Sequence, residues 1–384
     1  MKDEILDLIN KEEERQGKEA TLIASENFTY PEVLEVLGSC LTNKYAEGYP
    51  GKRYYQGNRI VDEIEQIAIE RTKKLFGVEA ANVQAYSGSP ANAAILMALA
   101  QPGEKIAGLK LSAGGHLTHG HPKVTFSGQY FESLQFDVDE EGRIDYEEVS
   151  KLVESERPKV LMVGSTAYPW IIDWEKFGKM AESVGAWLVA DISHLSGLIA
   201  GGVHPSPVPH AHIIMSTTHK MLRGPRGAVI GVTSLGLAKD NDLGTKIDKV
   251  VFPGLQGGPH MNNIAGIAIA LQKAGEPEYK EYAQKVVVNA KFLADELKKA
   301  ELKVWGTENH LMVVGVGEGR GKEVAQELEK EGIIVNANTI PHDPAGPFKP
   351  SGIRLGTPAM TVKGWGEKEW KEMAIEITRK VIGS

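Results

Sequence analysis

The sequence predicts an α/β protein in which a mostly parallel sheet flanked by helices is followed by a smaller C-terminal α/β domain. Short apolar runs alternate with helix-like stretches through the middle of the chain, a rhythm typical of a parallel sheet covered by helices. A long helical stretch then leads to a second, shorter set of strand-like and helix-like segments. The 384 residues, of which 42% are hydrophobic and 24% charged, supply enough apolar side chains for cores of this size.

Three helices are predicted before the sheet. Residues 2–16 carry Ile5, Leu8 and Ile9 at helical spacing among many charges, so we expect an amphipathic arm that packs against a partner subunit. A longer helix is predicted over Val61–Leu75, with Gly77 as its C-terminal stop. The apolar stretch Ala91–Ala100 is about half the roughly 20 residues that span a bilayer, so it indicates a buried helix and no membrane partner.

The central sheet is predicted from four apolar runs, and a helix is expected between the first two at Trp174–Val184. The runs are Lys159–Val163, Trp187–Ala190, Ile213–Met215 and Ala228–Val232. A helical stretch from about Asn262 to Lys299 leads to the second set, which is strand-like Leu311–Val316, a helix at Lys322–Glu331, strand-like Ile333–Asn336 and a terminal helix from about Glu367. We therefore expect an N-terminal arm at 1–20, a large domain at 21–270 and a small domain at 271–384.

Charge and cysteine content exclude several classes of partner and site. Lys and Arg number 43 against 51 Asp and Glu, a net charge of −8 without a basic stripe, so no nucleic acid is expected to bind. Cys40 is the one cysteine, which indicates a reducing, cytoplasmic compartment, and the first residues lack a secretory pattern. His116, His119 and His121 have no carboxylate or cysteine beside them, so no metal site is expected.

Polar residues that follow the apolar runs are the candidates for chemistry, because ligands bind at the carboxyl ends of strands in such sheets. Ser87-Gly88-Ser89-Pro90 precedes the apolar helix, and with Ser89 as its cap and Pro90 in its first position the free N–H groups would suit a phosphate. The alternative is that this segment merely starts a helix.

Lys220 and Asp191 follow two of the predicted strands. A buried lysine that loses its proton forms Schiff bases with carbonyl compounds, including pyridoxal phosphate. An aspartate at a neighbouring strand end would keep a pyridine nitrogen protonated. From these two residues alone, an ordinary Lys–Asp salt bridge remains an equal alternative.

Longer motifs of the chain resemble serine hydroxymethyltransferase from about residue 20 to 365. These motifs are Ile23–Phe28 (IASENF), Leu41–Tyr55 (LTNKYAEGYPGKRYY), Gly114–Gly120 (GGHLTHG), Thr217–Gly227 (TTHKMLRGPRG), Gln256–Pro259 (QGGP) and Ser351–Pro358 (SGIRLGTP). The resemblance implies a fold-type-I pyridoxal-phosphate-dependent transferase, similar to aspartate aminotransferase in fold. It also implies transfer of the hydroxymethyl carbon of L-serine to tetrahydrofolate or a related pterin, giving glycine and 5,10-methylenetetrahydrofolate.

The resemblance also implies how the cofactor is held. Lys220 would carry pyridoxal 5'-phosphate as a Schiff base, with Asp191 at the pyridine nitrogen and His116 stacked on the ring; His219 is a further catalytic candidate. The remaining cofactor contacts would be His194, Thr166 and Thr217, the phosphate ligands Ser87, Gly88 and Ser89, and Tyr45, Gly257 and Gly258 from the partner subunit.

For the substrates, the resemblance implies that Arg354 binds the amino-acid carboxylate and that Ser25 assists in this binding. Glu47 would act as the acid/base group together with Tyr55, both supplied by the neighbouring subunit, which requires at least a homodimer and leaves a tetramer open. The pterin would contact Tyr54, Leu111, Gly115, Leu117, Asn338, Gly346, Pro347 and Phe348.

Two other functions remain in competition at this point. A pyridoxal-phosphate-dependent threonine or β-hydroxy amino acid aldolase would share Lys220, Asp191 and Arg354 but need no pterin; Tyr54, Glu47 and Asn338 argue against it. A catalytically idle cofactor-binding module would be indicated by loss of Glu47, Lys220 or Arg354, all of which are present. The residues leave open whether the pterin is tetrahydrofolate or a modified carrier.

Overall fold

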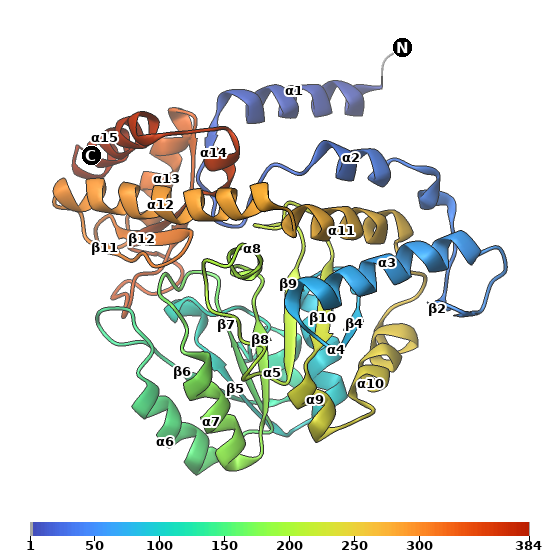
Figure 1. Cartoon of the computed structure of the whole chain (residues 1–384). Coiled ribbons are helices and arrows are strands. Elements are labelled where there is room, and N and C mark those ends of the chain that lie inside the picture. The colour runs from blue at the N-terminus through green and yellow to red at the C-terminus, as the bar shows by residue number, and fades with distance from the viewer. Residues whose placement is uncertain (1–2, 384) are drawn as a thin grey trace.

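The computed structural model describes residues 3–383 and confirms the α/β architecture (Figure 1). Within that range, the central sheet has seven strands in the order β4-β10-β9-β8-β7-β5-β6. The bounds are β4 (Ala80–Asn82), β5 (Lys105–Leu109), β6 (Glu132–Phe136), β7 (Val160–Gly164), β8 (Trp187–Asp191), β9 (Ile213–Thr217) and β10 (Ala228–Val232). Strands β5 to β9 run parallel to one another, and β10 is antiparallel to both of its neighbours.

Helices cover both faces of this sheet. One face packs against α3 (Arg59–Phe76), α6 (Tyr146–Glu156), α7 (Trp174–Val184), α8 (Ser196–Ala200) and α11 (Met261–Ala274). The other face packs against α4 (Gly88–Leu99), α5 (Phe126–Tyr130), α9 (Ser234–Lys239) and α10 (Leu243–Lys249). Because both faces are buried, the central strands read as continuous apolar runs instead of alternating ones, which is why they are visible in the sequence.

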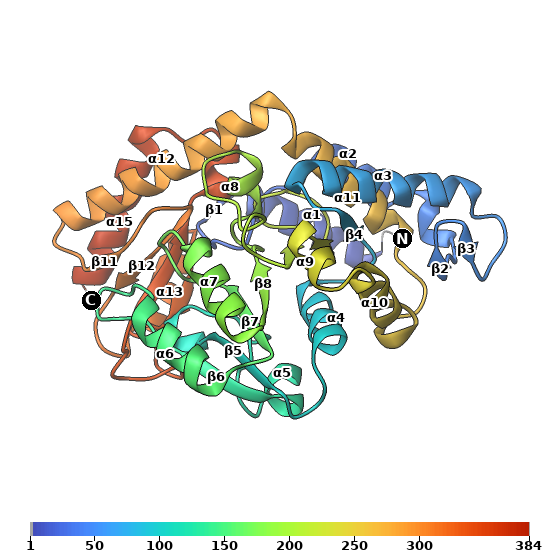
Figure 2. The ribbon, with the colours of Figure 1, turned by 60° about the horizontal axis from the view of Figure 1, so that its bottom comes forward.

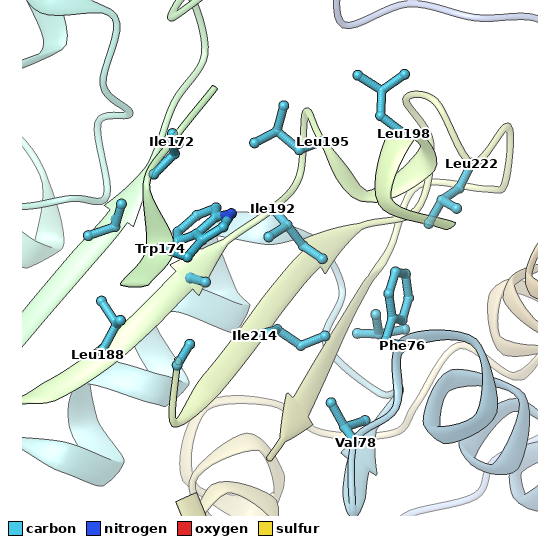
Figure 3. Packing of buried hydrophobic residues seen from close by; sticks show 14 of the residues in the cluster. Phe76, Val78, Ile172, Trp174, Leu188, Ile192, Leu195, Leu198, Ile214 and Leu222 are labelled. Carbon is cyan, nitrogen blue, oxygen red and sulfur yellow. The ribbon is translucent and has the colours of Figure 1, made fainter. Parts of the chain in front are cut away.

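The hydrophobic core on the first of these faces holds the loops that follow the strands in place. Ile192, Leu195 and Leu198 come directly after β8 and pack beside Ile214 of β9 and Leu222 (Figure 3). Fully burying a side chain of this size is worth about 1.5–3 kcal/mol. The apolar residues after β8 therefore hold this segment against the sheet, and its polar residues Ser193 and His194 line the cavity described below.

The C-terminal part contains a second, antiparallel sheet in the order β11-β12-β15-β14. Its strands are β11 (Val304–Trp305), β12 (Leu311–Gly315), β14 (Asn336–Asn338) and β15 (Gly352–Gly356), and its helices are α12 (Pro277–Lys299), α13 (Gly321–Lys330), α14 (Pro358–Val362) and α15 (Glu367–Ile382). Strand β1 (Ala20–Thr21) pairs in parallel with β13 (Ile333–Ile334), and Leu22 joins this second core. Figure 1 shows α12 crossing from this sheet toward α11.

The remaining elements lie toward the N-terminus or connect the others. They are α1 (Glu4–Lys18), α2 (Pro31–Leu37), the hairpin β2 (Gly48–Tyr49) and β3 (Lys52–Arg53), and the helical turns η1 (Cys40–Asn43), η2 (Leu111–Ala113) and η3 (Val250–Leu255). Helix α1 has no buried residue and carries its apolar stripe exposed. The hairpin lies at the opposite end of the molecule from the C-terminal sheet in both views (Figure 2).

Three predicted elements need correction. The helix expected from Asn262 to Lys299 is two helices, α11 and α12, because Gly275 ends the first and Pro277 starts the second. The strand expected at Ile333–Asn336 is divided between β13 and β14, which pair with different strands. Helix α4 begins at Gly88 with Ser87 as its N-cap, so Ser89 is not the cap and Pro90 is not the first helical residue.

The stop predicted after the third helix is confirmed: Gly77 has φ +72°, a left-handed conformation that favours glycine. The domain boundaries at 20 and 270 stay predictions. Among residues 3–383, no helix combines the length and apolar character that crossing a bilayer requires.

Candidate active site

A cavity of about 320 Å³ opens where β7, β8 and β9 end. Because these three strands are adjacent and parallel, the residues that follow them meet at one edge of the sheet. Ten of the predicted site residues line this cavity: Ser25, Gly88, His116, Thr166, Asp191, His194, Thr217, His219, Lys220 and Arg354. The structure thus brings together residues that lie up to 329 positions apart in the chain.

Lys220 is held near the end of β9 in an environment that favours its neutral form. Its Nζ donates to Thr217 Oγ1 at 2.9 Å. Burial lowers the pKa of Lys220 from 10.5 to about 8; the nearby positive charges of Arg354 and Arg226 add to this, and Asp191 opposes it. An amine with this pKa reaches its nucleophilic form near neutral pH.

Asp191, the last residue of β8, is buried and held by two polar side chains. Asn92 Nδ2 of α4 donates to Asp191 Oδ2 at 2.9 Å, and His119 Nε2 lies 2.9 Å from the same oxygen. Burial alone would raise the pKa of this carboxyl, but its hydrogen bonds with His119 and Ser193 hold the pKa well below its usual range. The second oxygen, Oδ1, accepts from the backbone N–H of Ser193 at 3.1 Å. Asp191 is therefore a fixed, ionised carboxylate inside the cavity wall.

The backbone is shaped around this carboxylate. Gly164 of β7 pairs with Asp191, and a Cβ at Gly164 would lie 2.3 Å from the Asp191 carbonyl oxygen. A Cβ at Gly88 would likewise lie 2.7 Å from Thr217 Cγ2, so the N-terminus of α4 reaches the end of β9 only because position 88 has no side chain.

Arg354 enters the cavity from β15 of the C-terminal sheet. Its Nη1 donates to the Thr166 carbonyl at 2.6 Å, its Nε to Asn336 Oδ1 at 3.1 Å, and its Nη2 to Ser25 Oγ at 3.4 Å. Arg354 is 9% exposed and has no carboxylate within ion-pair distance among residues 3–383. Burial lowers its pKa to about 10. A buried guanidinium without a protein carboxylate is suited to bind the carboxylate of a ligand.

The histidines of the cavity are neutral. Burial lowers the pKa of His116 to about 4 and that of His219 to about 3, and it places the pKa of His194 well below 6.5. His116 Nδ1 lies 2.7 Å from Thr118 Oγ1, which fixes the orientation of the ring. A neutral, fixed imidazole can pack against a planar ligand without adding positive charge to it.

The first turn of α4 forms the part of the cavity that suits an anion. Gly88 lines the cavity, and Ser87 and Ser89 are its neighbours in the chain. The hydroxyl of Ser87 makes no capping hydrogen bond, so it is available with the first N–H groups of the helix.

A second group of predicted residues lies outside this cavity, around the β2–β3 hairpin. Tyr45 Oη is 3.2 Å from Glu47 Oε1, and the Tyr45 and Tyr55 rings have centroids 5.0 Å apart. A Cβ at Gly258 would lie 3.4 Å from the Tyr45 ring, and one at Gly257 3.6 Å from Glu47 Oε1. These residues form one cluster, here called the hairpin cluster: Tyr45, Glu47, Tyr55, Gly257 and Gly258. Tyr54 lies next to it against Phe252, with ring centroids 5.8 Å apart.

The residues predicted for the pterin do not line this cavity either. Leu111 and Gly115 belong to the segment after β5, and Asn338 ends β14; the two segments touch through Thr339 Oγ1, which donates to the Ser112 carbonyl at 2.9 Å. Leu117 is exposed to solvent. The loop that carries Gly346, Pro347 and Phe348 is also at the surface, and Phe348 is 86% exposed.

Sequence reasoning missed several residues of the site. The cavity is also lined by Asn92, Ser165, Ser193 and Met215. His119 does not line it but contacts Asp191 through its Nε2. Asn92 carried a usable signal, because it is a polar residue in an otherwise apolar helix. His119 is in the GGHLTHG motif, but only the fold shows that its partner is Asp191. Within the described part of the chain, no group of three or more His, Cys, Asp or Glu is placed to hold a metal ion.

Comparison with known proteins shows the family of the chain. A family model described as serine hydroxymethyltransferase matches residues 1–377. A serine hydroxymethyltransferase of Acidothermus cellulolyticus is 53% identical over 375 residues, covering 96% of this chain and 86% of that protein. Those of Nostoc punctiforme and Campylobacter jejuni are 50% and 52% identical, covering 98% and 95% of this chain and 88% of each relative. The chain therefore belongs to the serine hydroxymethyltransferase family, as its motifs predicted.

Proposed function

We propose that this chain transfers the hydroxymethyl carbon of L-serine to tetrahydrofolate, giving glycine and 5,10-methylenetetrahydrofolate, at the cavity around Lys220. As a member of its family, it uses pyridoxal 5'-phosphate and tetrahydrofolate and acts on serine and glycine. The observation that carries the assignment to this cavity is the convergence of Lys220, Asp191 and Arg354 on one space. A base, an ionised carboxylate and a buried guanidinium are the three groups that a pyridoxal-phosphate enzyme for amino acids needs.

The residues present fit pyridoxal 5'-phosphate. Lys220 offers an amine of lowered pKa, and the ionised Asp191 can accept from a protonated ring nitrogen. His116 would cover the ring face, and Thr166, His194 and Thr217 supply polar groups along the ring edge. The free Ser87 hydroxyl, Gly88 and Ser89 would hold the phosphate at the N-terminus of α4. When bound, the cofactor supplies an electron sink for the bond that breaks in serine.

The substrate is held by charge. Arg354 would bind the serine or glycine carboxylate with two parallel hydrogen bonds, and the Ser25 hydroxyl beside it would add a third. Because three groups already fix the Arg354 side chain, its guanidinium is oriented before the substrate arrives. This arrangement selects an α-carboxylate and aligns the rest of the amino acid toward Lys220.

Moving a proton at the serine hydroxyl needs an acid/base group beside it, and a carboxyl group is suited to this role. Asp191 is committed to the cofactor side, and the remaining candidate, Glu47, belongs to the hairpin cluster. We infer a homodimer in which each subunit places its hairpin cluster against the cavity of the other. There Glu47 would exchange a proton with the serine hydroxyl beside Tyr55, and Tyr45, Gly257 and Gly258 would complete the phosphate site.

The pterin would bind at the rim of the same cavity. Leu111, Gly115 and Leu117 precede or flank His116, and Asn338 offers an amide that can pair with the donor and acceptor atoms of a pterin ring. Tyr54 would approach from the other subunit, and Gly346, Pro347 and Phe348 would cover the outer part of the ligand. A one-carbon acceptor placed there lies next to the serine side chain.

The test of the cofactor site is chemical. The purified protein loaded with pyridoxal 5'-phosphate is reduced with borohydride, digested and mapped by mass spectrometry. We expect the pyridoxyl group on Lys220 and no such label in Lys220→Gln. Labelling of another lysine would place the cofactor elsewhere and overturn the assignment.

A further inference from the structure

A hydrogen bond between two buried histidines joins the C-terminal sheet to the wall of the cavity. His194 Nδ1 lies 3.2 Å from His310 Nε2. His194 follows β8 and lines the cavity, whereas His310 directly precedes β12 and is 0% exposed. No predicted role includes His310, and the proposed chemistry above does not use it.

The segment that carries His310 is fixed on both sides. Asn309 Nδ2 donates to the Tyr168 carbonyl at 3.0 Å, two residues beyond the cavity residue Thr166. The backbone N–H of Thr357 donates to the His310 carbonyl at 3.1 Å, and Asn309 Oδ1 accepts from the backbone N–H of Leu311 at 3.0 Å. The His310 ring therefore has a defined position relative to both sheets, which a loosely held side chain would lack.

Both rings are neutral, which limits what each nitrogen can do. Burial, together with the positive charges of Lys220 and Arg354, lowers the pKa of His194 well below 6.5 and that of His310 to about 3. A neutral imidazole has one N–H donor and one acceptor nitrogen. The contact occupies Nδ1 of His194 in either tautomer, so Nε2 is the nitrogen that His194 has left for a ligand.

We propose that His310 is a positioning residue: it holds Nδ1 of His194 so that Nε2 of His194 is presented to the cofactor and substrate. The support comes from the same sheet that carries the substrate arginine, because β12, which follows His310, pairs with β15, which carries Arg354. His310 thereby holds His194 in a defined position relative to Arg354, at the point where the two sheets meet. This inference rests on the proposed function, since its readouts are serine turnover and the bound cofactor.

The first experiment compares four variants with the wild-type protein loaded with pyridoxal 5'-phosphate. His310→Leu and His310→Asn remove the group at Nε2, whereas His310→Gln keeps an amide near it. His212→Leu is the matched control, because His212 is a half-buried histidine at the opposite end of β9 whose Nδ1 serves only the Leu188 backbone.

We expect His310→Leu and His310→Asn to lower kcat/KM for serine about tenfold, the size of one hydrogen bond. We also expect both variants to shift the visible absorbance of the bound cofactor. His310→Gln should keep most of the wild-type kcat/KM and most of the wild-type absorbance. His212→Leu should match the wild type in both readouts. If His310→Leu does not fold, comparison of His310→Asn with His310→Gln still tests the hydrogen bond to His194 Nδ1, because only the glutamine places an amide near it.

A double-mutant cycle tests whether His310 acts through His194. In a His194→Ala background, replacing His310 by Asn should cause no further loss of kcat/KM and no further spectral shift. Equal losses with and without His194 would overturn the proposal, as would His310 variants that match the wild type. A wild-type protein that binds the cofactor but does not convert serine would instead refute the proposed function.

Discussion

Lys220 is half-buried beside Thr217, and this position lowers the pKa of its ammonium group. Only the neutral amine attacks an aldehyde, and burial lowers the pKa of Lys220 to about 8 from 10.5. The rate at which cofactor-free protein captures pyridoxal 5'-phosphate should therefore rise with pH through a midpoint near 8. Stopped-flow absorbance over pH 6–10.5 measures this profile.

Asp191 provides the control for that profile. Its negative charge raises the pKa of Lys220, so Asp191→Asn should move the midpoint to lower pH while weakening retention of the cofactor. A midpoint near 10 in the wild type would show that Lys220 is solvated like an ordinary lysine and would contradict the account of its burial.

Arg354 is the residue that we propose for recognition of the amino acid. Arg354→Lys keeps the charge but loses the planar fork, and a charge-assisted hydrogen bond is worth about 1.5–3 kcal/mol, so KM for serine should rise roughly 10- to 100-fold. Retention of pyridoxal 5'-phosphate should stay within twofold of the wild type, measured by equilibrium dialysis. A variant with unchanged KM would remove Arg354 from the substrate site.

At this scale the sequence predicted residues that follow strands and missed those that approach from elsewhere. Lys220 and Asp191 could be paired because parallel neighbouring strands end at the same edge. Asn92, His119 and His310 contact the site from a helix, a loop and the second sheet, and no local pattern relates their positions to Asp191 or His194. Their roles are set by tertiary packing alone.

Among the elements, the close pairing of β7 with β8 shapes the cavity floor. A Cβ at Gly164 would lie 2.3 Å from the Asp191 carbonyl oxygen and 2.8 Å from its Cβ. Gly164→Ala should therefore cost about 1–3 kcal/mol of unfolding free energy and displace Asp191, with weaker cofactor binding. Urea unfolding and cofactor titration measure the two effects.

The matched control for that change is Gly17→Ala in α1, where a Cβ meets no atom within 4 Å. It should leave cofactor binding unchanged and stabilise the helix slightly. If Gly164→Ala were equally harmless, the close approach of β7 to β8 at Asp191 would not constrain position 164 as the contact distances indicate.

Elements with an uninterrupted apolar pattern and clear flanks were predictable from the sequence. The bounds of α7 and β10 agree with prediction to the residue. The single helix predicted over 262–299 is wrong because apolar spacing continues across the break, while Gly275 ends α11 and Pro277 begins α12. Similarly, Ile333–Asn336 reads as one strand, but only pairing with β1 and β15 shows that it is two.

At the scale of the whole molecule, the site residues fall into two separated groups, the cavity and the hairpin cluster. If two subunits exchange these groups, Lys220→Gln and Glu47→Gln, each nearly inactive alone, should complement each other when mixed. After subunit exchange, random pairing gives about a quarter of wild-type activity, because half the dimers carry one intact site. Activity of the mixture against each parent measures this.

The complementation has a clear opposite outcome. A mixture with no more activity than its parents, under conditions where mass spectrometry shows exchanged dimers, would mean that Glu47 and Lys220 act within one chain. A doubly substituted chain mixed one to one with the wild type serves as control: its mixed dimers have no intact site, so after exchange the activity should fall to about half of the wild-type share. The exposed apolar stripe of α1 is predicted to pack in the same assembly.

The most direct test of the central claim follows the carbon itself. The protein loaded with pyridoxal 5'-phosphate is given tetrahydrofolate and L-serine labelled with ¹³C at Cβ, and products are followed by NMR. We predict that the label enters the methylene group of 5,10-methylenetetrahydrofolate while an equal amount of unlabelled glycine forms, and that Lys220→Gln abolishes both. If the serine stays intact, or if cleavage is equally fast without tetrahydrofolate and the label is released as formaldehyde, the transfer assigned to this cavity is wrong.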